Sequence, residues 1–210
     1  MQEFAETGNA MAFFQDVAPG YSVDEPQLCK WAKQLHGAMS YLGARGVAHR
    51  SIYPKHVLFT KKKVTAGNSS NSTTSTVELV AKLSGFRDAI IYWDPATEAV
   101  IPQPCKTLEE ATSFHAPEMF GAIGGGEFYD PIAADVWSYG CTLLYMAARV
   151  YRYCVNDVNL ELEIRNTVAD LGVSDTAKYW LFGLLRQNTA ARTTFYAIDK
   201  DPPWFGSFSE

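Results

Sequence analysis

The sequence predicts a mainly α-helical domain that is built around one buried helix and carries a few short β-hairpins. Residues 131–150 are apolar on nearly every face, which is typical of a helix at the centre of a domain. Residues 22–43 repeat apolar side chains at spacings of three and four, the pattern of a long amphipathic helix. The other regular segments are shorter helices and short, β-rich runs, and we expect one domain rather than two.

Composition excludes several classes of partner. The chain has 210 residues, a hydrophobic content of 47% and a net charge of −5, which argues against nucleic acid or an anionic membrane surface. No signal peptide or membrane-spanning run is recognisable. The four cysteines lie far apart and form no CxxC pair. We therefore expect free thiols, no metal centre and a cytoplasmic location.

The N-terminal part is expected to be helical. Residues 10–14 suggest a short helix that Pro19 and Gly20 stop. The pattern Ser22-x-x-Glu25 resembles a capping box, with Pro26 tolerated in the first turn. It predicts that the long amphipathic helix begins there and ends near Gly43 or Gly46.

The middle of the chain is expected to be strand and loop. Residues 57–60 and 77–83 are predicted strands, and the polar tract between them cannot bury apolar area, so it is predicted to be a mobile hairpin tip. Residues 89–93 suggest a further short strand. Residues 94–117 contain four prolines and are predicted to be irregular. Further segments are assigned as a Gly-rich linker at 121–126, helices at 160–171 and 174–186, and an aromatic tail at 204–208.

Five motifs in order resemble those of protein kinases. Residues 47–58 resemble the catalytic loop, and residues 81–87 stand where that family has its metal-binding DFG turn. Residues 116–118 match the APE motif, and residues 135–140 match the start of the family's central helix. Arg192 matches the late arginine that pairs with the APE glutamate. The resemblance is greatest to Ser/Thr kinases of the calmodulin-dependent and AMP-activated type.

The resemblance implies the C-terminal lobe of the protein-kinase fold over residues 1–205, with 206–210 as a tail. Residues 1–9 resemble the hinge between the two lobes. The low-complexity insert is residues 61–76, and the activation-segment-like stretch is residues 85–118. No Gly-rich phosphate loop or strand lysine is recognisable, so the N-terminal lobe is expected to be missing.

The positions that would carry catalysis are degenerate. A kinase needs an Asp to accept the substrate's hydroxyl proton and an Asp and an Asn to hold metal ions. This chain has Ser51, Gly85 and His56 there, and Tyr53 replaces the lysine that faces the transferred phosphate. Asp88 could substitute only through a shifted turn. The resemblance therefore predicts no catalytic residue, no metal site and no enzyme activity.

The nucleotide site implied by the resemblance is only partial. Backbone atoms of Glu3 and Ala5, with Leu58 beneath the adenine, would form a weak half-site. We therefore expect no cofactor. Binding of ATP with magnesium is implied only by the family resemblance.

The supporting residues of the family are retained. From the residues alone, Asp135 is either an exposed helix cap or an anchor for a nearby loop, and the resemblance favours an anchor for the catalytic-loop backbone. Arg50 matches an arginine that grips a phosphorylated activation loop, although a surface arginine is the plainer interpretation. The structural set comprises His49, Arg50, Phe86, Glu118, Asp135 and Arg192.

These observations predict a catalytically inactive, kinase-like module that works in signalling as an interaction or scaffold domain. Its partner would be a protein, with an active kinase or a kinase substrate as the expected classes. One alternative is a fragment of a Ser/Thr kinase with residual ATP binding and phosphotransfer. Another is a truncated piece of a longer kinase gene.

Overall fold

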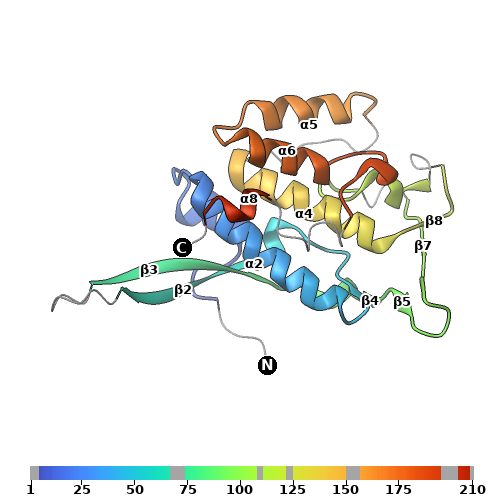
Figure 1. The fold of residues 1–210 in the computed structure, drawn as a ribbon, viewed down its shortest axis with the longest axis horizontal. Helices are drawn as coiled ribbons and strands as arrows, with labels where there is room; N and C mark the ends of the chain where they lie inside the picture. Colours follow the sequence, from blue (N-terminus) through green and yellow to red (C-terminus); the bar gives the residue numbers. More distant parts are fainter. Residues whose placement is uncertain are drawn as a thin grey trace.

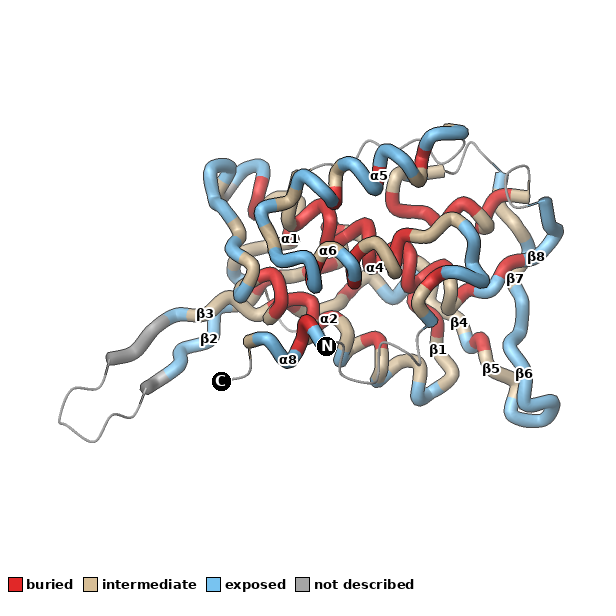
Figure 2. The backbone as a smooth tube through the Cα atoms, turned by 45° about the horizontal axis from the view of Figure 1, so that its top comes forward, coloured by how far each residue is buried: buried red, intermediate tan, exposed pale blue. Residues whose placement is uncertain are grey.

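The computed structural model describes residues 5–66, 74–107, 111–121, 125–149, 157–194 and 203–208. Its centre is helix α4, Pro131–Ala148, and every residue from Ala134 to Met146 is buried. Figures 1 and 2 show the other helices packed around α4, where the buried positions concentrate. The buried central helix predicted from the sequence is confirmed.

Polar side chains on α4 hold the segments around it. The hydroxyl groups of Ser138, Tyr139 and Thr142 are buried, and each donates to a backbone carbonyl of another segment. Their acceptors are the carbonyl oxygens of Phe114, Ala32 and Ile52, at 2.8–2.9 Å. A buried hydroxyl without a partner would cost free energy, so these polar positions fix where the neighbouring loops lie.

Helix α2, Glu25–Gly43, is the predicted amphipathic helix, but its cap differs from the prediction. Asp24, not Ser22, caps it by accepting a hydrogen bond from the Gln27 amide at 2.9 Å. The Glu25 carboxylate cannot complete a capping box because it accepts from the amide and hydroxyl groups of Ser174 and from the Trp204 indole. Contacts with distant residues therefore use the Glu25 side chain that the local sequence pattern assigned to the helix cap.

The remaining helices are short. Helix α1, Ala10–Ala12, continues into a π-helical turn, Phe13–Val17. Helices α5, Leu160–Ala169, and α6, Asp175–Leu184, form two outer layers on α4 (Figure 1). Helix α8, Pro203–Gly206, packs against α2 and α6 and buries Trp204.

Strands β2, Val57–Ala66, and β3, Thr74–Leu83, form an antiparallel hairpin with Val57 opposite Leu83. It is longer than the two predicted runs because the pairing extends into the polar tract. Helix α2 covers its base, where the Trp31 indole donates to the Leu79 carbonyl at 3.0 Å. The outer part projects from the helical body (Figures 1 and 2). Residues 61–76 were predicted to be a mobile tip, but residues 61–66 and 74–76 are paired in this ladder. The rest of that tract, residues 67–73, lies outside the described residues.

Three small ladders frame the centre of the chain. Strand β1, Val47–Ala48, pairs with β4, Ile90–Ile91; β5, Trp93–Asp94, with β6, Ala99–Val100; and β7, Gln103–Pro104, with β8, Phe128–Tyr129. The segment that the prolines marked as irregular is thus partly paired. The predicted strand at 89–93 is interrupted at Tyr92, whose side chain is buried.

Four 3-10 turns complete the described elements. They are η2, Pro54–His56; η3, Phe86–Asp88; η5, Pro117–Met119; and η6, Thr189–Ala191. Within the described ranges, no helix has both the length and the apolar character needed to cross a membrane.

Candidate functional site

The loop His49–Ser51 is held in place by Asp135 at the start of α4. One carboxylate oxygen accepts from the His49 amide at 2.6 Å and the other accepts from the Arg50 amide at 2.7 Å. Asp135 is 3% exposed. Burial raises the pKa of its carboxyl to about 7, and the two amide donors oppose that rise. The structure therefore places Asp135 as a loop anchor rather than as an exposed cap.

Ser51 and Tyr53 face inward beside His56. Ser51 is 1% exposed, so its hydroxyl does not face solvent. The Nδ1 atom of His56 lies 2.7 Å from the Ser51 carbonyl oxygen, and the rings of Tyr53 and His56 are 5.0 Å apart. Burial raises the pKa of the Tyr53 hydroxyl. This loop presents an imidazole and a phenol and no carboxylate.

Gly85 and His56 share one small volume. Gly85 has a left-handed backbone, with φ of +81°, and a Cβ atom placed on it would lie 2.4 Å from Cγ of His56. The Ser84 amide donates to the His56 carbonyl at 2.8 Å, which keeps the two segments together. The imidazole therefore occupies the space into which any side chain at position 85 would extend.

The three positions do not fit a magnesium ion. Magnesium prefers octahedral oxygen ligands, whereas Gly85 has no side chain, Ser51 is buried and His56 offers nitrogen. Within the described ranges, no group of three or more His, Cys, Asp or Glu side chains has a metal-binding arrangement. Asp88 lies close enough to His49 for its charge to raise the His49 pKa, which places it beside the same loop.

Replacing Gly85 with Ala should test the shared volume. We expect a loss of about 2–3 kcal/mol in the free energy of unfolding, from left-handed strain of about 1–2 kcal/mol plus the contact with His56. Chemical denaturation measures it. Gly8→Ala is the matched control, because Gly8 has a φ of +72° but nothing within 4 Å of its Cβ position. When Gly85→Ala is combined with His56→Ala, the part of the stability loss that comes from the contact with the imidazole should disappear, while the left-handed strain should remain. Strictly additive losses for the two substitutions would contradict the idea that the two side chains compete for one volume.

His49 is buried beneath Phe86. Its exposed fraction is 1%, its Nε2–H group donates to the Ser84 carbonyl at 2.9 Å, and its ring lies 4.8 Å from that of Phe86. Phe86 itself is half exposed. Burial is the main cause that lowers the pKa of His49 to about 4.

This depressed pKa predicts how stability changes with pH. The unfolded His49 takes up a proton near pH 6.5 and the folded one does not, so its contribution is present above pH 6.5 and is lost toward pH 4. Relative to His49→Gln, the native protein should lose about 2 kcal/mol of stability between pH 7.5 and pH 5. Asp135, whose raised pKa acts in the opposite direction, is present in both proteins and cancels. Urea melts at several pH values measure this difference, and parallel curves would contradict the prediction.

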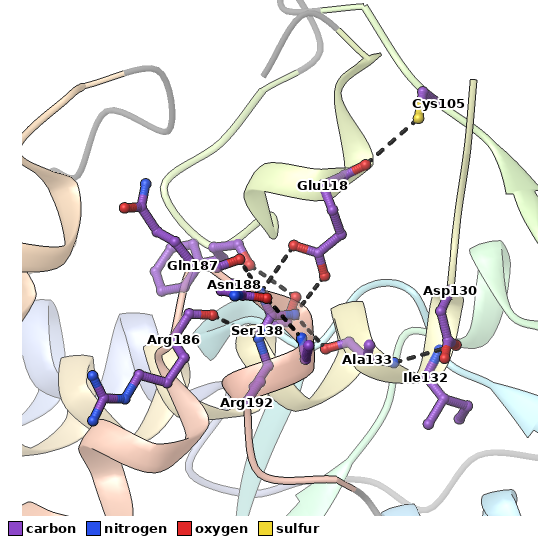
Figure 3. Close-up of polar contacts among 12 residues, drawn as sticks. Cys105, Glu118, Asp130, Ile132, Ala133, Ser138, Arg186, Gln187, Asn188 and Arg192 are labelled. Atoms are coloured by element: carbon purple, nitrogen blue, oxygen red, sulfur yellow. Dashed lines mark hydrogen bonds and ion pairs between the residues drawn. The ribbon is translucent and has the colours of Figure 1, made fainter. Parts of the chain in front are cut away.

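Glu118 and Arg192 form a second cluster at the same end of α4 (Figure 3). Both Nη atoms of Arg192 donate to the Glu118 carboxylate, one of them at 2.9 Å. The guanidinium also donates to the carbonyl oxygens of Arg186, Ala133 and Gln187. The sequence predicted the ion pair but gave no signal for these three backbone contacts. Two of them close the turn after α6, and the third joins that turn to α4.

The first turn of α4 joins the two clusters. The Ala133 carbonyl accepts from Arg192, and two residues later Asp135 holds the loop at His49 and Arg50. The structure thus brings together the predicted supporting residues on both sides of α4.

The nucleotide half-site is only partly described. Glu3 lies outside the described residues. Ala5 is half-buried, and its carbonyl accepts from the Gly8 amide in a turn beside β2. Leu58, also half-buried, forms a bridge with Asn9. The binding of a nucleotide by Ala5 and Leu58 stays a prediction.

Comparison with known proteins identifies a family. The model of the protein kinase domain matches residues 1–205. The chain is 29% identical over 141 residues to "Serine/threonine-protein kinase CHK1" of Mycosarcoma maydis, covering 67% of this chain and 18% of that protein. It is 30% identical over 146 residues to the human "Non-receptor tyrosine-protein kinase TNK1", covering 70% of this chain and 18% of that protein. It is 26% identical over 193 residues to "CBL-interacting protein kinase 20" of Oryza sativa subsp. japonica, covering 90% and 37%.

A solved structure shares the fold. The kinase domain of Rad53, crystallised with SCD2 and AMPPNP, superposes with a TM-score of 0.64 at 19% identity, covering 97% of this chain and 67% of that one. At this identity the likeness shows the fold alone. The chain spans between 18% and 37% of the length of these curated relatives.

Two predictions require correction. The fold class was predicted as a mainly α C-terminal lobe with short β-hairpins, but the match is to the protein kinase domain as such, with strands as well as helices, and not to a C-terminal lobe alone. The prediction of a single lobe rested on the absence of recognisable motifs, and short strands, several of which pair with distant segments, leave little periodic signal in a sequence. The prediction that the chain is not an enzyme is also contradicted, since each of the named relatives is a protein kinase. The prediction of no activity rested on the side chains at Ser51, His56 and Gly85 alone, whereas the family match extends over residues 1–205.

Proposed function

Because the chain belongs to the protein kinase domain family, we propose that it acts in signalling by binding another protein, with an active kinase or a kinase substrate as the expected partner class. One observation carries this proposal. Asp135 holds the loop His49–Ser51 through two hydrogen bonds, although Ser51 is buried and offers no carboxylate. A fold that keeps its supports around such a loop can still present a defined surface.

The retained ion pair supports the same proposal. The Arg192 side chain is 1% exposed and that of Glu118 14% exposed. Breaking one half of a buried pair costs about 3–5 kcal/mol, so losing either partner would destabilise the fold around the kinase-like loops. A cytoplasmic location belongs to the proposal and is supported by the free thiols of Cys29, Cys105 and Cys141.

Affinity capture tests protein binding. The folded chain, immobilised by one end, should retain a protein that then forms a binary complex of fixed stoichiometry in light scattering. The same matrix without the immobilised chain serves as the control for non-specific adsorption. If no protein is retained above that control, protein binding is not the function of this chain.

Phosphotransfer is the second candidate, and family membership favours it. It predicts transfer of the labelled γ-phosphate of ATP to a protein substrate. That labelling should disappear in a His56→Ala, Asp88→Ala double variant, because these are the titratable side chains beside the loop. A thermal melt with millimolar Mg-ATP gives an independent measure, since a ligand at 100 times its Kd stabilises by about 2.7 kcal/mol. No labelling and no shift would exclude this candidate.

A further inference from the structure

A cleft lies on the outer side of the Glu118–Arg192 pair. Its volume is about 550 Å³, within the range of about 300–1,000 Å³ that is typical of binding pockets. Aromatic and aliphatic side chains from β5, β6 and β8 form one wall, including Trp93, Val100 and Phe128. The start of α4 and the turn η6 form the other wall. Of the individual site residues predicted from the resemblance, Glu118 and Arg192 line this cleft, and Ser51, Tyr53, His56 and Gly85 do not.

The positive charge in the cleft is already satisfied. All three nitrogens of the Arg192 guanidinium donate to protein oxygens, two of them to the Glu118 carboxylate. The pair is therefore neutral as a unit, and its donors are occupied. An anion such as phosphate would find no free donor on Arg192.

The remaining charge among the lining residues is the Asp130 carboxylate. One of its oxygens caps α4 by accepting from the amides of Ile132 and Ala133 at 2.8 and 3.4 Å. The other oxygen has no hydrogen-bond partner among the described residues. Asp130 is exposed, so this oxygen can meet a ligand from solvent.

Apolar side chains line the same cleft as this carboxylate. Phe128 is 59% exposed and Val100 36% exposed, and Trp93 is half-buried. A cleft lined by both aromatic rings and a carboxylate favours a cation with an apolar stem, because ring faces and the carboxylate both attract positive charge. Arginine and lysine side chains have this form.

We propose that this cleft, formed by Trp93, Val100, Phe128 and Asp130, binds a basic side chain of a partner polypeptide, with flanking apolar residues against Phe128. The inference rests on the proposed function and specifies the chemistry of the partner. The occupant is a segment with one arginine or lysine beside apolar residues.

Two matched peptides test the site on the purified full chain. Each has nine residues with leucines beside the central position, which is arginine in one and its neutral isostere citrulline in the other. Binding is followed through the indole N–H resonance of Trp93, assigned with a Trp93→Phe variant. The arginine peptide should bind at least about fivefold more tightly than the citrulline peptide, the size of one partly exposed charge pair.

Asp130→Asn should remove that preference. Asn caps helices about as well as Asp, so the variant removes the charge while keeping the cap. Phe128→Ala should weaken both peptides. Tyr179→Ala, at an 83% exposed position that does not line the cleft, should change neither.

Several results would overturn the site. These are equal binding of the two peptides, an unchanged preference in Asp130→Asn, or a Trp93 response to inorganic phosphate that the peptides do not compete for. Failure of the proposed function looks different. If a captured partner binds Asp130→Asn as tightly as the native chain, the proposed function is supported and this site is excluded. If no partner is captured but the arginine peptide is still preferred, the site is supported and the proposed function is excluded.

Discussion

Arg192→Leu is expected to lower the free energy of unfolding by about 3–5 kcal/mol, because it breaks a buried ion pair. The change leaves the Glu118 carboxylate without its partner and frees the carbonyl oxygens of Arg186, Ala133 and Gln187. It also removes a cation from the face of Trp137, 5.1 Å away. Urea denaturation followed by circular dichroism measures the loss.

Arg186 supplies the matched control. It pairs with Glu161 at 3.0 Å, with side chains 32% and 36% exposed, so Arg186→Leu should cost no more than about 1 kcal/mol. Arg192→Lys should fall between the two, because lysine keeps the charge but cannot reproduce the planar set of donors. Equal losses for Arg192→Leu and Arg186→Leu would show that burial of the pair does not matter.

Asp135→Ala is expected to cost about 2–5 kcal/mol. Two buried backbone amides, those of His49 and Arg50, would lose their acceptors, and an unpaired buried polar group costs about 1–3 kcal/mol. Hydrogen exchange of these two amides should accelerate more than that of the core of α4. Arg50 already has a φ of +64°, so the loop should relax once the anchor is removed.

Asp130→Ala is the control on the same helix. It removes an exposed cap, which costs about 1 kcal/mol, and leaves the loop anchored. If exchange at His49 and Arg50 rises equally in both variants, the anchor role assigned to Asp135 is wrong.

The contacts of Asp135 and of the Glu118–Arg192 pair, the supports of the kinase-like loops, help to distinguish the two candidate functions. The Asp135 contacts and the Glu118–Arg192 pair meet at the first turn of α4. Ser51, His56 and Gly85 lie beside them, at the positions where the kinase motifs place catalytic and metal-binding side chains. A protein-binding role needs only the supports, whereas phosphotransfer needs these three positions as well. The capture and labelling experiments therefore separate the two functions.

The sequence by itself determined the elements whose signals are local. The apolar length of α4, the periodicity of α2 and the β-rich runs of the β2–β3 hairpin can be read from neighbouring residues, because helices and hairpins form mainly from short-range contacts. The contacts of Asp135 with the loop and of Glu118 with Arg192 followed from family motifs rather than from local pattern.

Only the tertiary structure decided the features that depend on residues distant in sequence. Glu25 forms no capping box because its carboxylate accepts hydrogen bonds from Ser174 and Trp204. Gly85 has no room for a side chain because the His56 ring lies there. The β1–β4 and β7–β8 ladders and the cleft beside Asp130 likewise form from segments far apart in the chain. Packing competes with local preference for the same side chains, and in each of these cases packing prevailed.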